Sequence, residues 1–269
     1  MDINQKITEE LGVKKWQVDA AVSLIDEGNT IPFIARYRKE ATGTLDDEQL
    51  RTLFERLTYL RGLEEKKEQV LGSIEEQGKL TDELKAQILA AETLVVVEDL
   101  YRPYRPKRRT RASIAKEKGL EPLAALITLQ KADRPLEELA AEYVDPEKGV
   151  ETPEDALAGA RDIIAENISD EADFRSWIRK ATMKKGKIVS TAKDPEAESV
   201  YEMYYEFEEP AGKLAGHRIL ALNRGEKEKF LNVKVEAPEE EILRYLQKQL
   251  VREENPYTTP LLQEAVQDS

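Results

Sequence analysis

Hydrophobic residues recur along most of this chain at spacings of three and four, which place them on one face of a helix. The longest such stripe passes through Leu50, Leu53 and Leu57 and predicts a helix over about Asp46–Gln77. Capping residues, glycines and prolines divide the remainder into shorter helices. These are predicted over Asp2–Gly12, Lys14–Glu27, Thr81–Ala91, Thr93–Tyr101, Ala112–Lys118, Glu121–Gln130, Glu154–Asn167, Asp170–Lys185 and Glu239–Arg252, with one more opened by Pro135.

The pattern changes after Gly186, where apolar and polar residues begin to alternate. Ile188–Thr191 and Leu231–Glu236 have the alternation of strands. Gly216–Leu222 fits either a short helix or one arm of a hairpin, with helix slightly favoured. The tail, Asn255–Ser269, has little to bury.

These elements predict a mainly α protein, an elongated multi-helical array with helix-turn-helix-like elements and a minor β ribbon after about residue 186. We expect residues 1–186 to form a helical region and residues 187–269 a helical and β connecting region. The run Leu94–Val97 is unusually apolar and is expected in a core. Val96→Asp should therefore unfold the chain, because an unpaired charge is costly in an apolar interior.

The first two predicted helices are joined by Leu11–Val13, and their spacing resembles that of a helix-turn-helix pair. In such pairs the second helix enters a DNA groove, and here it offers Lys14, Lys15 and Gln17 near its start. A plain helical hairpin is the commoner arrangement, so both interpretations stay open.

Composition narrows the possible chemistry. The 269 residues are 40% hydrophobic and 35% charged, as in a soluble chain with one large or two modest cores. No apolar run could span a membrane and the start resembles no signal peptide, so we expect a cytoplasmic protein without a membrane partner. Cysteine is absent and His217 is the only histidine, which excludes thiol catalysis and two-histidine metal motifs. We therefore expect that the protein is not an enzyme and that it has no catalytic residues, no bound metal and no cofactor.

The net charge of −13 is unevenly distributed. Residues 1–134 contain 23 Lys+Arg and 24 Asp+Glu, whereas residues 135–269 contain 18 and 30. An acidic surface repels the phosphate backbone, so the first half is the expected nucleic-acid face.

The segment Asp99–Arg111 is strongly basic within this acidic chain. Pro103 and Pro106 should hold it extended, with Tyr101 and Tyr104 available for stacking on bases. Its cations are Arg102, Arg105, Lys107, Arg108, Arg109 and Arg111. They suit phosphate contact, but clamping of acidic helix ends in the same protein is the commoner use of such a loop, and both interpretations stay open.

Several long motifs resemble one protein family in their order along the chain. They are Ile31–Asp47 (I-P-F-I-A-R-Y-R-K-E-A-T-G-T-L-D-D), Asp99–Pro122, Ala158–Ile168 (A-G-A-R-D-I-I-A-E-N-I) and Gly216–Arg224 (G-H-R-I-L-A-L-N-R). They are similar to the N-terminal region of the Tex family of bacterial transcription accessory proteins, and the likeness extends over essentially the whole chain.

The resemblance implies a mostly helical, elongated cytoplasmic protein that influences transcription and binds nucleic acid, RNA or single-stranded DNA. In that family a nuclease-like domain, helix-hairpin-helix units and an S1 RNA-binding domain follow this region. We therefore expect an N-terminal scaffold and interaction fragment whose nucleic-acid binding comes mainly through the missing domains. RNA polymerase and ribosome-associated proteins are candidate partners. The alternatives are a protein-binding module with no nucleic-acid contact, or part of a metal-dependent nuclease whose catalytic domain is absent.

The resemblance also points to candidate binding residues. In the motif A-R-Y-R-K, Arg36, Arg38 and Lys39 have the chemistry for contact with phosphate or an acidic partner, as do the cations between Arg102 and Arg111. Arg36 and Tyr37 could equally tie helices together, because planar guanidinium groups make good internal clamps.

Overall fold

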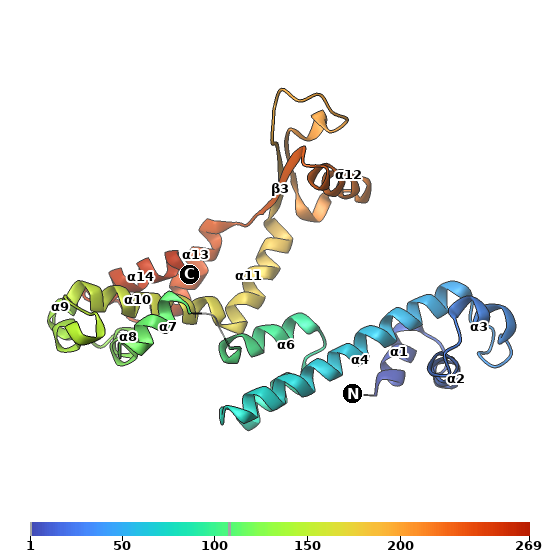
Figure 1. The fold of residues 1–269 in the computed structure, drawn as a ribbon, viewed down its shortest axis with the longest axis horizontal. Coiled ribbons are helices and arrows are strands. Elements are labelled where there is room, and N and C mark those ends of the chain that lie inside the picture. Colours follow the sequence, from blue (N-terminus) through green and yellow to red (C-terminus); the bar gives the residue numbers. More distant parts are fainter. Residues whose placement is uncertain (1, 107–108) are drawn as a thin grey trace. The chain divides into compact units, whose positions relative to one another are not determined.

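A computed structural model describes residues 2–106 and 109–269. The chain folds into two compact units, residues 1–104 and residues 105–269. Fourteen α-helices and one three-stranded sheet lie in the described ranges (Figure 1). The prediction of a mainly α protein with a minor β ribbon is confirmed.

The first unit is built around α4 (Asp47–Glu76), which is 30 residues long. Asp46 caps this helix by accepting a hydrogen bond from the Gln49 N–H, and the predicted leucine stripe is buried along it. Leu50 and Leu53 are fully buried where α1 and α3 pack on α4. The other helices are α1 (Ile3–Leu11), α2 (Lys15–Asp26), α3 (Ile31–Tyr37), α5 (Asp82–Ala90) and α6 (Leu94–Tyr101).

Helix α6 corrects one prediction. Val97 is fully buried, but Val95 and Val96 are 47% and 41% exposed. A helix of eight residues that packs on α4 and α5 buries only one face, and Val97 lies on it. The prediction that the whole run Leu94–Val97 lies in the core is therefore wrong, and the reason to expect unfolding by Val96→Asp no longer holds.

The second unit is organised around α10 (Pro153–Asp170), which Thr152 caps and which contacts most of the other helices. A Cβ atom on Gly159 would lie 2.4 Å from Leu120 Cδ1, so a larger residue there would displace the buried Leu120 side chain. The other helices are α7 (Arg111–Glu117), α8 (Glu121–Thr128), α9 (Leu136–Ala140), α11 (Ala172–Lys185), α12 (Gly216–Lys227), α13 (Glu239–Leu250) and α14 (Thr259–Asp268).

The tail is helical, contrary to expectation. In α14, Leu262, Ala265 and Val266 are buried in the core of the second unit. Three apolar residues at spacings of three and one are too few to predict a helix from the sequence. Helix α10 supplies the surface against which they are buried. Asn255 fixes the start of the segment, because its Oδ1 accepts hydrogen bonds from the N–H groups of Tyr257 and Thr258.

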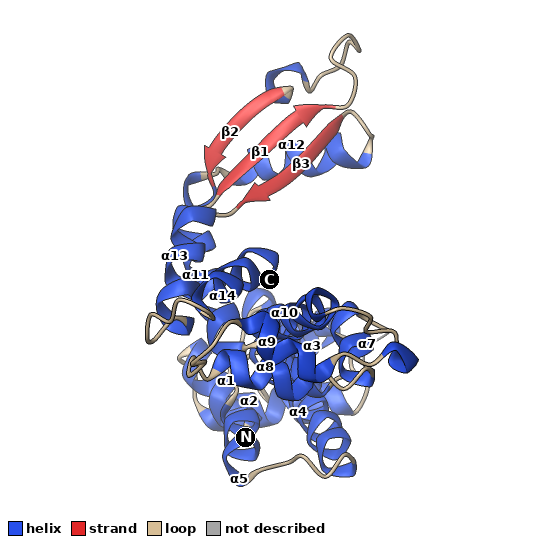
Figure 2. Cartoon of the chain, turned by 90° about the vertical axis from the view of Figure 1, so that its left-hand side faces the viewer, coloured by secondary structure: helices blue, strands red, loops and turns tan. Residues whose placement is uncertain are grey.

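The sheet contains β1 (Lys187–Ala192), β2 (Glu206–Pro210) and β3 (Leu231–Glu236) in the order β2-β1-β3, all antiparallel. Helix α12 lies along one face (Figure 2), where Leu222 and Leu231 are buried. The helix predicted from Gly216 is confirmed and is longer than expected. The division into regions at residue 186 stays a prediction, although the change from α11 to β1 falls there.

Candidate nucleic-acid interface

Helix α3 presents aromatic and cationic side chains on one surface. Thr30 has an extended backbone before the helix and Pro32 occupies its first turn, which is a favourable helix start. Ile34 is fully buried and anchors the helix in the core of the first unit. Phe33 and Tyr37, one turn apart on the other side, are 37% and 62% exposed.

These rings and the neighbouring cations are in contact. The ring centres of Phe33 and Tyr37 lie 5.3 Å apart. The guanidinium carbon of Arg36 lies 5.9 Å from the Tyr37 ring centre, and that of Arg38 lies 5.6 Å from the Phe33 ring centre. Lys39 follows directly and is exposed. We refer to these residues, Phe33, Arg36, Tyr37, Arg38 and Lys39, as the α3 cluster.

The turn after α3 is held by α2. Gln17 donates hydrogen bonds from Nε2 to the carbonyl oxygens of Thr42 and Gly43, and Thr42 is fully buried. Gly43 has a φ of 62°, and a Cβ atom there would lie 2.4 Å from the Trp16 ring. The backbone that carries Arg38 and Lys39 is thus fixed by packing rather than free to move.

The cations of the α3 cluster differ from the arginines of α4 in lacking carboxylate partners. Within the described ranges no carboxylate forms an ion pair with Arg36, Arg38 or Lys39. Other arginines of the unit are paired: Arg51 with Asp47, Arg56 with Glu10 and Arg61 with Asp26. The α3 cations therefore remain available for an external anion.

The Arg56 pair shows the contrast most clearly. Arg56 donates from Nε and Nη2 to the two Glu10 carboxylate oxygens, at 2.6 and 2.8 Å. These hydrogen bonds lower the pKa of the Glu10 carboxyl and raise that of the Arg56 guanidinium. An arginine that already forms two hydrogen bonds with a carboxylate of the same protein is not available to bind an external anion.

The basic segment after α6 is only partly as predicted. Arg102–Tyr104 forms a 3-10 turn, so the expectation of an extended conformation is wrong there. Tyr101 and Tyr104 pack partly buried against the core, and the Tyr101 hydroxyl lies 3.0 Å from Ser73 Oγ. They are therefore not free for stacking on bases. Arg102 and Arg105 are exposed, but neither lacks an interaction partner within the protein.

The last residues of that segment, Arg109 and Arg111, form ion pairs within the second unit. Arg111 is the first residue of α7, and it binds Asp268 at 2.6 Å and Asp162 at 3.5 Å. The hydrogen bond to Asp268 raises the pKa of the Arg111 guanidinium. Arg109 lies 3.5 Å from Glu117. These three ion pairs favour the clamping interpretation for Arg109 and Arg111, while Lys107 and Arg108 lie outside the described residues.

The first two helices form the predicted pair, and Gly12 makes the turn with a φ of 64°. Two of the three proposed contact residues have internal partners: Lys15 binds Asp2 at 2.7 Å, and Gln17 holds the turn after α3. Groove reading by this pair stays a prediction, and Lys14 is the side chain left for it.

Other kinds of site find little support in the described residues. Over these ranges no group of acidic or histidine side chains could hold a metal ion. His217 is exposed at the start of α12, and its side chain forms no hydrogen bond with any described residue. None of the described helices is long and apolar enough to cross a membrane.

Sequence reasoning identified the cations of the α3 cluster but missed Phe33. The signal was present, because Phe33 and Tyr37 are four residues apart and share a helix face. It was not used because no helix was predicted over Ile31–Tyr37. The interpretation of Arg36 and Tyr37 as ties between helices has no support, since their ring contacts are to each other and to Phe33 on the same helix.

Two family models match the chain. The Tex-like protein N-terminal domain matches residues 1–75, and the Tex central region-like family matches residues 131–266.

Named relatives cover nearly the whole chain. The uncharacterised protein YdcI of Bacillus subtilis (strain 168) is 48% identical over 99% of this chain and 38% of its own length. The transcriptional accessory protein Tex of Neisseria gonorrhoeae is 45% identical over 87% of this chain and 31% of its own. The human S1 RNA-binding domain-containing protein 1 is 30% identical over 87% of this chain and 24% of its own. This chain thus spans well under half the length of these relatives.

Proposed function

Because the chain belongs to the Tex family, we propose that it is the N-terminal scaffold and interaction region of a cytoplasmic transcription accessory protein, and that it binds single-stranded nucleic acid through the α3 cluster. The names of two relatives, a transcriptional accessory protein and an S1 RNA-binding domain protein, support an association with transcription and RNA. In a longer protein this surface would add to the binding by other domains.

One observation carries the proposal: the α3 cations have no carboxylate partner in the described chain, although the protein has a net charge of −13. In such a protein an exposed cation is easily neutralised by a neighbouring acid, as Arg56 is by Glu10. Leaving Arg36, Arg38 and Lys39 unpaired on a fixed backbone keeps their charge for an external anion. Phosphate is one of the anions that planar guanidinium groups can bind through two parallel hydrogen bonds.

The aromatic rings favour single strands. A base in a single strand exposes its face, and stacking on an aromatic side chain contributes about 1–3 kcal/mol per base. Phe33 and Tyr37 present two exposed rings beside the cations. A duplex hides its base faces, so it would gain only the interactions with phosphate.

The test is a triple substitution, Arg36→Ala, Arg38→Ala and Lys39→Ala, in the whole chain. We expect weaker binding of labelled single-stranded RNA and DNA, and a slope of log affinity against log salt that is smaller by about 0.7 for each phosphate that the variant no longer neutralises. The melting temperature should change little, because these side chains pair with no acid in the described fold and the variant loses only exposed cation–ring contacts.

A matched control removes Lys79 and Lys85, two exposed lysines of the same unit that also form no ion pair with described residues. Their replacement by alanine lowers the charge without touching the α3 cluster, and affinity should fall much less. Equal decreases in affinity per charge removed, three in the triple variant and two in the control, would mean that binding follows net charge alone. No binding by the parent chain would favour the alternative of a protein-binding module, with RNA polymerase as a candidate partner.

We also propose that this region is not an enzyme. Incubation of the chain with RNA and single-stranded DNA in the presence of divalent metal should leave both intact. Cleavage that disappears when one particular carboxylate is replaced would contradict this and support the nuclease alternative.

A further inference from the structure

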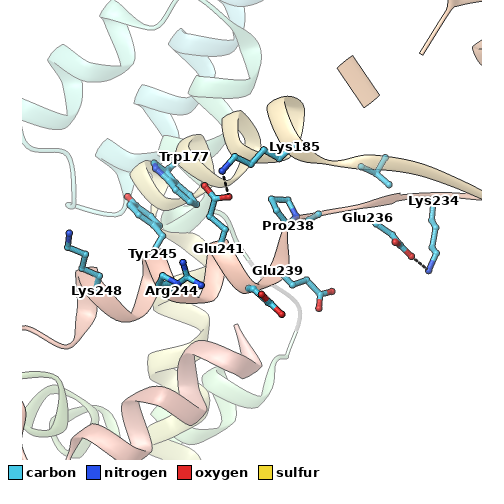
Figure 3. A pocket seen from close by; sticks show the side chains of 13 residues that line it. Trp177, Lys185, Lys234, Glu236, Pro238, Glu239, Glu241, Arg244, Tyr245 and Lys248 are labelled. Atoms are coloured by element: carbon cyan, nitrogen blue, oxygen red, sulfur yellow. Dashed lines mark hydrogen bonds and ion pairs between the residues drawn. The ribbon is translucent and has the colours of Figure 1, made fainter. Parts of the chain in front are cut away.

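A groove of about 1130 Å³ lies in the second unit, where α11 and α13 meet the end of β3 (Figure 3). One wall is a pair of stacked rings: Trp177 of α11 and Tyr245 of α13 lie 3.7 Å apart between centres, with their planes 4° from parallel. Phe174 packs edge-on against Tyr245 at 6.1 Å. The rings support each other, so this apolar wall is already formed before any ligand binds.

The other wall is the end of an edge strand. In the described sheet β3 pairs with β1 on one side only, and Val235 is 58% exposed. A Cβ atom on Gly186 would lie 2.4 Å from the Thr182 carbonyl oxygen and 3.2 Å from that of Glu236, so the chain enters β1 and leaves β3 in close contact. The groove thus runs beside a rigid junction that carries a free strand edge, and such edges accept extended peptides.

Some of the charges lining the groove neutralise each other. Lys185 binds Glu241 at 2.5 Å, and Lys234 binds Glu236 at 2.6 Å. Figure 3 shows the first of these pairs beside the stacked rings and the second at the strand end. These four side chains have little net charge to offer a ligand.

The remaining charges are separated along α13. Glu239 and Glu240 lie in its first turn. Arg244 and Lys248 lie one and two turns further on, as Figure 3 shows relative to Glu239. None of the four forms an ion pair with a residue that the structure describes, and all are exposed. The groove is therefore acidic at one end and basic at the other.

We propose that this groove binds an extended segment of a partner protein, with a basic residue toward Glu240, acidic residues toward Arg244 and Lys248, and apolar residues between them. Glu240 and Lys248 are eight residues apart on one helix face, which is about 12 Å at 1.5 Å per residue. Three or four residues of an extended chain cover that distance at about 3.3 Å each. The middle residues would meet the stacked rings, and the part of the segment that continues past Glu240 would reach the strand end at Val235. Nucleic acid fits less well, because Glu239 and Glu240 repel phosphate.

The experiment uses a fluorescein-labelled synthetic peptide in which alternating valines separate two lysines from two glutamates, titrated with the whole chain. Binding should weaken about tenfold when the protein carries Arg244→Glu and Lys248→Glu, since two attractions become repulsions. A second peptide, with its glutamates replaced by lysines, should bind this variant better than the parent. Lys116→Glu, an exposed cation on α7, is the control and should leave the affinity unchanged.

Recovery by the charge-swapped peptide separates the site from general effects of charge or folding, because a misfolded variant would bind neither peptide. Absence of binding at the highest soluble peptide concentration would overturn the proposal. So would binding that ignores the charge reversal, or displacement of the peptide by single-stranded RNA that itself depends on Arg244 and Lys248. Binding by this chain but not by a full-length relative would assign the groove to another segment of the longer protein, and would equally contradict it.

Discussion

Replacing Lys67 by methionine should destabilise the first unit by about 2 kcal/mol. The Lys67 side chain is 2% exposed, and its ammonium donates to Glu64 Oε1 and to the Leu89 carbonyl oxygen, both at 2.9 Å. Hydrogen bonds to charged groups contribute about 1.5–3 kcal/mol each. Glu64 is 27% exposed and regains some hydration, and removal of a buried ammonium recovers part of its desolvation cost, which together reduce the destabilisation.

The assay is urea unfolding followed by the fluorescence of Trp16. Trp177→Phe in both proteins removes the other tryptophan, so that the signal reports the first unit alone. Lys66→Met is the matched control: Lys66 pairs with Glu98, the side chains are 27% and 41% exposed, and the destabilisation should stay below about 1 kcal/mol. A stability of Lys67→Met within about 0.5 kcal/mol of the parent, or equal destabilisation of both variants, would refute a stabilising role for the buried ammonium.

Three further predictions concern named contacts. Val97→Asp should unfold the first unit or make the chain insoluble, whereas Val96→Asp, at a site 41% exposed, should keep nearly the parent's melting temperature. Hydrogen bonds from Arg56 hold the pKa of the Glu10 carboxyl below its ordinary value of 4.5. The stabilisation that they give should therefore be present above about pH 4.5 and disappear on further acidification. Arg56→Met should flatten this part of the curve of melting temperature against pH. Arg111→Ala should lower the melting temperature slightly and leave nucleic-acid affinity unchanged; a decrease in affinity with an unchanged melting temperature would contradict its role as a clamp.

Helix starts could be predicted because their causes are local. Asp2, Asp46, Thr81 and Thr152 each accept a hydrogen bond from a backbone N–H three residues on, and the sequence contains both partners of that contact. The long stripe on α4 was equally clear, since it repeats over several turns.

Elements that depend on a distant partner could not be predicted. Strand β2 contains three glutamates, Phe207 and Pro210, a composition that does not predict a strand, and its pairing with β1 shows only in the folded chain. Helix α14 needs α10 to bury it. For the candidate site, the cations of A-R-Y-R-K were visible, but the absence of acidic partners among the described residues was not, because ion pairs such as Arg56 with Glu10 join residues far apart in sequence.

The most direct test of nucleic-acid binding by the α3 cluster is to identify the residues that touch the bases. The whole chain is irradiated with a single-stranded RNA that contains 4-thiouridine, and the crosslinked peptides are identified by mass spectrometry. Stacking on Phe33 and Tyr37 predicts crosslinks within Ile31–Tyr37, which Phe33→Leu with Tyr37→Leu should abolish. Crosslinks confined to residues 105–269, or unchanged in the double variant, would contradict the account.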